Sequence, residues 1–303
     1  MATRSFTLKA TILLLGVDGG GTRCRARLAT PGGEVLGEGA GGPANIRFGL
    51  DESFAAIFAA AGECLRAAGL APSALARAVA CLALAGASEP THLAAARARP
   101  HPFRAALITS DAHAACLGAH GGEDGGVVII GTGTIAWANL NGRQHRFAGW
   151  GFPASDEGSG AWLGCEAVRR LLWANDGRID WTPLLAELFA DFGADLHALV
   201  RFADQARPRD FARLAPAVVE HARRGDPVGR ELMQLAAGHV DQLARRLIAC
   251  GVPRLSLVGG LAEPIAPWLA EETRRRLTPP RGDALSGALA LARAEADALR
   301  VLV

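Results

Sequence analysis

The sequence predicts an α/β protein of two domains related by internal duplication, and two glycine-rich loops support this prediction. In the first, an apolar run ends in Asp18, three glycines and Thr22. In the second, Val127-Val128-Ile129-Ile130 runs into Gly131-Thr132-Gly133-Thr134. In both halves three strand-like segments surround the loop, and later strands alternate with helices. This pattern is typical of a parallel α/β sheet, and its recurrence indicates a duplication.

The first loop has the composition of a phosphate-binding turn. Gly19, Gly20 and Gly21 lack a Cβ atom, so their backbone N–H groups can approach an anion closely. Asp18, at the end of the strand, would supply a carboxylate to nucleotide-bound Mg²⁺, directly or through water. A glycine-rich hairpin with an acid at its tip is the alternative from this stretch alone. The second copy of the pattern favours the phosphate-binding turn.

Two other nucleotide motifs are excluded by their context. Gly131-Thr132-Gly133 with Ala136 fits a dinucleotide fingerprint, but that motif opens a helix. Here the chain continues as strand-like residues to Leu140 and then Asn141-Gly142, a strong hairpin signal. The lysine-containing P-loop is also excluded, because Lys9 in the N-terminal tail is the only lysine in the chain.

Composition indicates a small-molecule partner. A length of 303 residues suits two domains of ordinary size, and 50% hydrophobic residues supply ample core. The net charge of +2, with acids and bases interspersed, offers neither a basic stripe for nucleic acid nor a polybasic tail for a membrane. No segment reaches the roughly 20 apolar residues that span a bilayer. Six scattered cysteines without a C-x-x-C pair predict reduced thiols and a cytoplasmic protein.

The first half is predicted to be βββαβαβ followed by a helix. After strands ending near Asp18, Thr30 and Leu36, Asp51 or Ser53 would cap a helix that runs to about Ala68 and stops at Gly69. The remaining elements are a buried strand at 77–85, a helix at 91–99, a strand at 105–109 and a helix at 111–120.

The second half is predicted to open with three strands and then become mostly helical. Helices are expected at 158–175, 182–190, 194–205, 209–223 and 227–250, with a late strand at 254–258 leading into Gly259-Gly260 and a final helix at 283–299. Domain 1 should comprise residues 1–115 with the C-terminal helix 283–303, and domain 2 residues 116–282.

The order and spacing of these motifs resemble the actin, Hsp70 and sugar-kinase superfamily, and most closely its BadF/BadG/BcrA/BcrD-type kinases of N-acetylglucosamine or glucosamine. The resemblance covers nearly the whole chain. It implies the two-domain actin-like ATPase (ribonuclease H-like) fold, with duplicated βββαβαβα halves around a nucleotide cleft. The motifs are Asp18-Gly-Gly-Gly-Thr22, Ala44-Asn45-Ile46, Ala83-Leu84-Ala85-Gly86, Thr109-Ser110-Asp111-Ala112, Gly131-Thr-Gly-Thr134, Gly149-Trp150-Gly151, Asp156-Glu-Gly-Ser-Gly160 and Val258-Gly259-Gly260-Leu261-Ala262.

Phosphoryl transfer to a sugar needs a residue that takes the hydroxyl proton, and Asp111 is the candidate. It follows a strand and begins a helix, so an ordinary N-cap is the structural alternative. The resemblance implies the catalytic role. It also implies that substrate is bound by Asn45, Ile46, Gly86, Gly149, Trp150, Gly151 and Asp156, and ATP by Gly19, Gly20, Gly21, Thr22, Gly131, Thr132, Gly133, Thr134, Gly259 and Gly260.

Some of these residues also have simpler interpretations. Asn45 suits a turn, Trp150 a core aromatic, and Asp156 the cap of the helix near Gly158. His113, Cys116 and His120 fall on one face of the helix after Asp111, where a packed face is favoured over a zinc site because no fourth ligand is evident.

The expected function is ATP- and Mg²⁺-dependent phosphorylation of the 6-hydroxyl of N-acetylglucosamine. The Gly-Trp-Gly segment resembles that of the N-acetylglucosamine enzymes. Glucosamine, which has a free amine, and acylated sugars other than N-acetylglucosamine are the alternatives. A second alternative is an ATP-driven regulatory or activator ATPase. The activators of 2-hydroxyacyl-CoA dehydratases hold an iron–sulfur cluster on cysteines. Here the residue before the second loop is Ile130 and not a cysteine, which disfavours an activator of that kind. A homodimer is suggested by analogy with relatives alone.

Overall fold

The computed structural model describes residues 12–301, so Lys9 lies outside the described residues. The chain divides into two compact units. The first runs to Gly125 and adds Asn141–Gln144 and the chain from Pro280 onward, and the second comprises Gly126–Leu140 and His145–Pro279. The predicted boundary after residue 115 falls inside a helix that the structure places wholly in the first unit. Within residues 12–301, no helix combines the length and apolarity needed to cross a membrane.

The first unit is a five-stranded sheet in the order β3-β2-β1-β4-β5. Strands β1, β2 and β3 are antiparallel neighbours, and β4 and β5 continue the sheet parallel to β1. The elements are β1 (Leu13–Gly19), β2 (Cys24–Ala29), β3 (Val35–Gly41), α2 (Leu50–Ala67), η1 (Pro72–Arg77), β4 (Ala78–Leu84), α3 (Pro90–Arg97), β5 (Ala105–Ser110), α4 (Asp111–His120) and α13 (Ala284–Val301).

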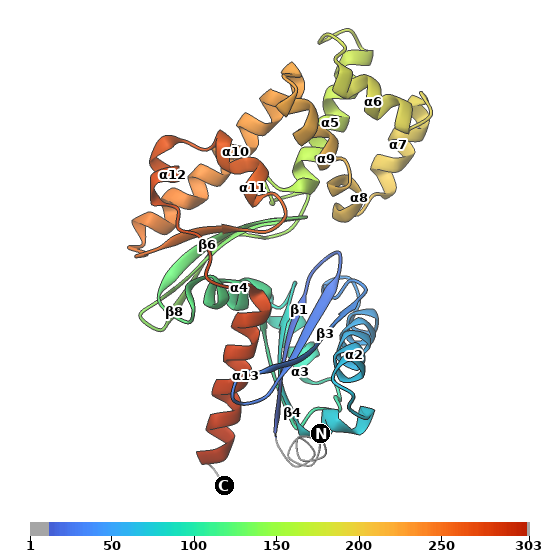
Figure 1. The fold of residues 1–303 in the computed structure, drawn as a ribbon. Helices are drawn as coiled ribbons and strands as arrows, with labels where there is room; N and C mark the ends of the chain where they lie inside the picture. The colour runs from blue at the N-terminus through green and yellow to red at the C-terminus, as the bar shows by residue number, and fades with distance from the viewer. Residues whose placement is uncertain (1–11, 302–303) are drawn as a thin grey trace. The chain divides into compact units, whose positions relative to one another are not determined.

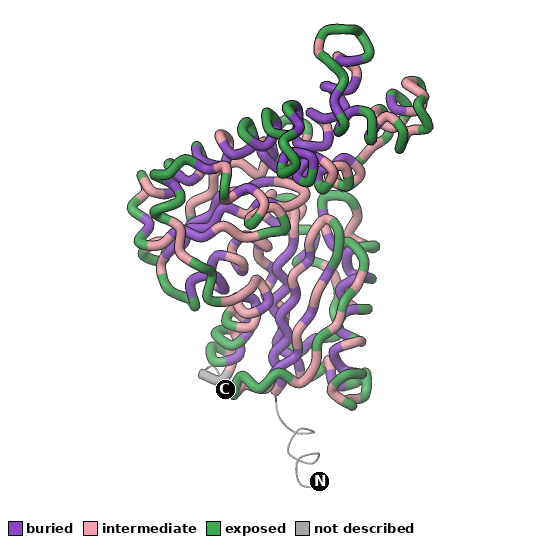
Figure 2. The backbone as a smooth tube through the Cα atoms, turned by 45° about the horizontal axis from the view of Figure 1, so that its top comes forward, coloured by how far each residue is buried: buried purple, intermediate pink, exposed green. Residues whose placement is uncertain are grey.

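Both faces of this sheet are covered, as Figure 1 shows for α2 on one side and α13 on the other. Successive side chains of a strand point to opposite faces. Accordingly Leu13, Leu15 and Val17 of β1 pack in the core beneath α2, whereas Leu14 packs in a second core with α13. The central strands are therefore buried along their length (Figure 2). This double burial explains why the sequence of β1 is a continuous apolar run.

A four-stranded sheet, β8-β7-β6-β9, lies mostly in the second unit and repeats the start of this topology, with β9 parallel to β6. Asn141 and Gly142 both have positive φ, which confirms the predicted hairpin turn between β7 and β8. The elements are β6 (Gly125–Ile130), β7 (Thr134–Leu140), β8 (Arg143–Ala148), α5 (Gly160–Asn175), α6 (Pro183–Asp191), α7 (Leu196–Gln205), α8 (Pro208–Ala212), α9 (Ala215–Arg223), α10 (Pro227–Ala249), β9 (Leu255–Val258), α11 (Ala262–Ile265), η2 (Ala266–Trp268) and α12 (Glu271–Arg276).

Some local predictions were wrong. The helix expected at 209–223 is two helices, α8 and α9, because Pro216 lacks an N–H and its ring would clash with the carbonyl four residues earlier. Neither Asp51 nor Ser53 caps α2. Its N-cap is Gly49, which has no side chain to contribute, and the Ser53 hydroxyl donates to the Gly49 carbonyl instead.

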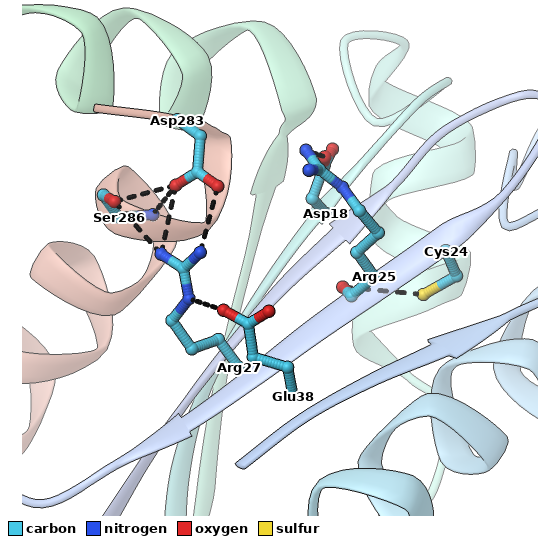
Figure 3. A network of polar contacts seen from close by, with 7 residues as sticks. All are labelled: Asp18, Cys24, Arg25, Arg27, Glu38, Asp283 and Ser286. Atoms are coloured by element: carbon cyan, nitrogen blue, oxygen red, sulfur yellow. Dashed lines mark hydrogen bonds and ion pairs between the residues drawn. The ribbon is translucent and has the colours of Figure 1, made fainter. Parts of the chain in front are cut away.

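The C-terminal helix is tied to the first sheet by Arg27 (Figure 3). From β2, the Arg27 guanidinium donates two bonds to the Asp283 carboxylate, at 3.1 and 3.2 Å, and one to Glu38 of β3 at 2.5 Å. Asp283 also accepts from the backbone N–H of Ser286, as an N-cap does. Burial raises the pKa of Asp283, but the Ser286 hydrogen bonds and the Arg27 charge lower it by more, leaving it below its ordinary value.

We expect Arg27→Met to lower the free energy of unfolding by about 1–3 kcal/mol, because two carboxylates lose their shared charged donor. Urea unfolding at pH 7 measures this. The Asp283 contribution is present at neutral pH and is lost as the pH falls below the ordinary pKa of 3.8 towards the lower folded value. Arg66→Met is the control, because the Arg66 side chain is 75% exposed and its ion pair is long, with 3.7 Å between Arg66 Nη2 and Glu63 Oε1. An exposed pair of this kind contributes little to stability. Equal effects of the two substitutions would contradict the prediction.

Candidate active site

The first glycine loop is a tight turn between β1 and β2. The Gly20 N–H donates to the carbonyl of Arg23 at 3.0 Å, which closes the turn. A Cβ on Gly19 would lie 2.6 Å from Leu84 Cδ2 and 3.0 Å from Ala44 Cβ, so a side chain there would force its buried neighbours to shift. A Cβ on Gly21 would meet nothing closer than the Asn45 side chain at 3.9 Å. The space beside the Gly21 Cα atom is therefore open, apart from the Asn45 side chain.

Asp18 lies at the base of this loop and is paired with Arg25 (Figure 3). The two residues are directly opposite in the β1–β2 register, and Arg25 Nη2 lies 2.7 Å from Asp18 Oδ2. Sequence reasoning missed Arg25, although the cross-strand position of a predicted hairpin could have revealed it. A single carboxylate beside a glycine turn fits Mg²⁺ where the ion keeps waters and nucleotide oxygens as its other ligands.

Three neighbouring strands bring the remaining first-unit candidates to the same edge of the sheet. In the parallel registers, Gly19 pairs with Leu84 and Leu84 with Ser110, so β1, β4 and β5 end level with one another. The glycine loop, Gly86 and Asp111 each follow one of these carboxyl ends. Ligands bind at this edge in open α/β sheets.

Asn45, Ile46 and Gly86 are in contact. The Ile46 N–H donates to the carbonyl of Ala85 at 3.1 Å. A Cβ on Gly86, which has a φ of +88°, would lie 2.9 Å from Asn45 Oδ1. Asn45 Oδ1 also accepts from the Arg47 N–H, so Asn45 does form the turn that its residue type suggests. The turn fixes the amide beside the glycine loop.

Asp111 is the first residue of α4, whose predicted bounds are confirmed. It is not the N-cap. Ser110 is, because its hydroxyl accepts from the His113 N–H at 3.1 Å. The Asp111 carboxylate accepts from the adjacent Ala112 N–H at 2.9 Å and is half-buried. Since Ser110 caps the helix, capping does not account for the acid at position 111.

The second loop is packed against Asp156 and the start of α5. Asp156 Oδ1 accepts from the Thr134 N–H at 3.3 Å, and a Cβ on Gly133 would lie 2.8 Å from Asp156 Oδ2. The Gly160 N–H donates to the Gly131 carbonyl at 2.8 Å. Asp156 is buried and does not cap α5, whose N-cap is Ser159. Its carboxylate lies against the second glycine loop instead.

Gly259 closes the same sheet edge in the second unit. Its φ is +101°, and a Cβ would lie 2.4 Å from the carbonyl oxygen of Ile130, the residue before the second loop. That carbonyl also accepts from the Leu261 N–H at 3.0 Å. Gly260 has nothing within 4 Å of a Cβ position. The Gly259-Gly260 loop and the Gly131–Thr134 loop thus lie side by side.

Gly149, Trp150 and Gly151 form an irregular segment after β8. A Cβ on Gly149 would lie 2.8 Å from the Ile135 side chain, and the Gly151 carbonyl accepts from the Ser155 N–H at 3.0 Å. Trp150 is 69% exposed, which excludes the core-aromatic interpretation. The Arg146 guanidinium lies over its ring, 4.1 Å from the centroid. No local sequence signal pointed to Arg146.

The face of α4 with His113, Cys116 and His120 makes polar contacts within its own unit. Thr109 Oγ1 and Gln144 Nε2 lie 3.0 and 3.3 Å from the two ring nitrogens of His113. The Cys116 thiol donates to the carbonyl of Gly125 at 3.3 Å, and His120 is fully buried. Over residues 12–301, no group of three or more His, Cys, Asp and Glu side chains is arranged to hold a metal ion.

We expect His113→Gln to flatten the dependence of stability on pH between 7.5 and 5. Burial lowers the pKa of His113, so the folded state disfavours the protonated imidazole relative to the unfolded state. The wild type therefore has its full stability above the ordinary pKa of 6.5 and loses part of it as the pH falls below that value. Urea unfolding at several pH values measures this. Identical pH profiles for both proteins would refute the prediction.

Comparisons with known proteins agree with these observations. The chain resembles the glucosamine kinase GspK of Vibrio cholerae serotype O1, with 36% identity over 278 residues that cover 92% of this chain and 95% of the relative. It also resembles an N-acetylmuramic acid/N-acetylglucosamine kinase of Clostridium acetobutylicum, with 26% identity covering 94% of this chain and 99% of the relative.

A solved structure of a Chromobacterium violaceum protein, provisionally named an N-acetylglucosamine kinase, matches with a TM-score of 0.88 and 34% identity, covering 93% of this chain and 99% of that one. The expected actin-like fold of two related α/β halves is thereby confirmed. A model of the BadF/BadG/BcrA/BcrD ATPase family matches residues 15–282. The chain therefore belongs to the BadF/BadG/BcrA/BcrD ATPase family.

Proposed function

We propose that this protein transfers the γ-phosphoryl group of ATP to the 6-hydroxyl group of N-acetylglucosamine. The main support is the arrangement at the carboxyl edge of the first sheet, where the glycine loop, the Asn45–Gly86 contact and Asp111 follow strands that end level with one another. Phosphoryl transfer needs a group that binds phosphate, a group that orients the acceptor and a group that accepts a proton. We assign these tasks to the glycine loop, to Asn45 with Gly86, and to Asp111, respectively.

In the proposed reaction, the backbone N–H groups of the two glycine loops bind the phosphates, and Thr22 and Thr132 donate further hydrogen bonds. The Gly259-Gly260 backbone lies against the adenosine. Bound Mg²⁺ would neutralise phosphate charge, and Asp18 would hold it, directly or through water. Asp111 accepts the proton of the sugar hydroxyl as its oxygen bonds to the γ-phosphorus and the bond to the bridging oxygen of ADP breaks.

The sugar would be held by Asn45, Asp156 and the segment around Trp150. Asn45 and Asp156 offer an amide and a carboxylate to ring hydroxyls, and the exposed indole offers an apolar face to the pyranose. The Gly149-Trp150-Gly151 segment favours the acetylated sugar. Glucosamine is the second candidate, because the 36%-identical relative is named a glucosamine kinase.

Release of ADP from Mg-ATP tests the proposal, with N-acetylglucosamine, glucosamine, glucose and no sugar compared in parallel. Strong stimulation by N-acetylglucosamine is the expected result. Stimulation by glucosamine alone would support the second candidate. ATP hydrolysis at the same rate with and without sugar would overturn the kinase proposal in favour of an ATP-driven regulatory ATPase.

We further infer that the protein works in the cytoplasm as a homodimer. None of the six cysteines, all of which are described, is in a disulfide, which suits a reducing compartment. Burial raises the pKa of Cys24, Cys64 and Cys81 to about 12, so these thiols are unreactive at neutral pH. The homodimer is inferred only by analogy with the oligomeric state of related kinases. A native mass equal to the chain mass of 31.4 kDa would contradict it.

A further inference from the structure

One arginine contacts Ala148, at the end of β8, and the next two residues, Gly149 and Trp150, which begin the segment that is proposed to bind the sugar. From β8, Arg146 Nη2 donates to the carbonyl of Gly149 at 2.6 Å and Nε donates to the carbonyl of Ala148 at 3.2 Å. The same guanidinium lies 4.1 Å from the centroid of the Trp150 ring. The planar guanidinium has donors in a fixed fork and a flat face that stacks on the ring, whereas a lysine ammonium has neither.

The geometry of the segment explains why it needs this support. Ala148 and Gly149 have φ values of 58° and 70°, so the chain turns through the left-handed region at two successive residues, one of them not glycine. The Trp150 side chain is 69% exposed, so burial does not fix its ring. The backbone is anchored on either side by the Gly149–Ile135 contact and the Ser155–Gly151 hydrogen bond. Between these anchors, the Arg146 contacts orient the indole.

We propose that Arg146 is a positioning residue that orients the Trp150 ring for sugar binding. Its guanidinium occupies one face of the indole, so a pyranose can stack only on the opposite face. Removal of Arg146 frees the ring to change rotamer and relaxes the turn at Ala148. The sugar then binds beside an indole that is no longer held in one orientation, whereas the two glycine loops are unchanged. This inference rests on the proposed function.

The test compares Arg146→Met, which keeps the apolar stem, with the wild type and with Arg143→Met. Arg143 is an exposed arginine of the same strand, so its substitution removes the same charge from β8 without touching the segment. For Arg146→Met we expect the sugar KM to rise on the order of tenfold, with kcat and the ATP KM within about twofold. Arg146→Lys should restore the affinity only in part. Arg143→Met should match the wild type.

A double-mutant cycle with Trp150→Ala identifies the route of the effect. If Arg146 acts through the indole, Arg146→Met should add less than about twofold to the sugar KM of the Trp150→Ala variant. Calorimetric binding of the sugar without ATP should give the same pattern. An unchanged sugar KM in Arg146→Met, or full additivity with Trp150→Ala, overturns this inference while the kinase proposal stands. A wild type that no sugar stimulates overturns the proposed function, and this inference with it.

Discussion

Replacing Asp111 by Asn is expected to lower kcat by about 10²–10⁴-fold, the usual contribution of a general base, while sugar affinity stays within about tenfold. The amide is nearly isosteric and its oxygen can still accept from the Ala112 N–H, as Asp111 Oδ1 does at 2.9 Å. It cannot accept the proton of the attacking hydroxyl at neutral pH. Steady-state ADP release gives kcat, and calorimetry with sugar alone gives the affinity.

Ser110→Ala is the matched control, because it changes the neighbouring residue and removes the N-cap of the same helix. This variant should lose about 1 kcal/mol of stability and keep most of its turnover. If it lost as much turnover as Asp111→Asn, disturbance of the helix start would explain both results. An Asn variant with near-normal kcat would show that Asp111 is not the base.

Much of this arrangement could be predicted because it is encoded locally. The strand before each glycine loop is an apolar run, which ends at Asp18-Gly19 in the first case and just before Gly131 in the second. The helix α4 begins and ends at the predicted residues, since Ser110 and Gly121 are strong N-cap and C′ residues. The duplication is also visible in the loops after later strands. Gly86 and Gly259 follow the second parallel strand of their sheets, each with positive φ.

The missed features depend on contacts between residues distant in sequence or on backbone geometry. The contact between Arg25 and Asp18 depends on the register of the β1–β2 hairpin. The contact between Arg146 and Trp150 depends on a left-handed turn that the residue types there do not predict. Asp156 precedes a helix, so it suggested a cap, yet tertiary packing turns its carboxylate onto the second glycine loop. Side-chain direction in irregular segments follows from such packing rather than from local propensity.

Asp156 is where the largest effect on sugar affinity is expected, and two substitutions separate its structural contribution from its proposed contact. Asp156 has a φ of 72° and is only 8% exposed. Alanine would leave the Thr134 N–H without its side-chain acceptor and would be strained at positive φ. We expect Asp156→Ala to lower the free energy of unfolding by about 2–3 kcal/mol and to raise the sugar KM by about 100-fold or more.

Asp156→Asn keeps what the fold needs and removes only the charge. Asparagine tolerates the left-handed region, and its Oδ1 can still accept from Thr134. Its stability in urea should therefore lie within about 0.5 kcal/mol of the wild type, whereas its sugar KM should rise by about 10–100-fold, because a charged acceptor binds hydroxyls more strongly than an amide. If the Asn variant kept wild-type sugar affinity, Asp156 would be a support for the second glycine loop and not a sugar ligand. A loss of stability equal to that of Asp156→Ala would instead show that the loop itself requires the negative charge.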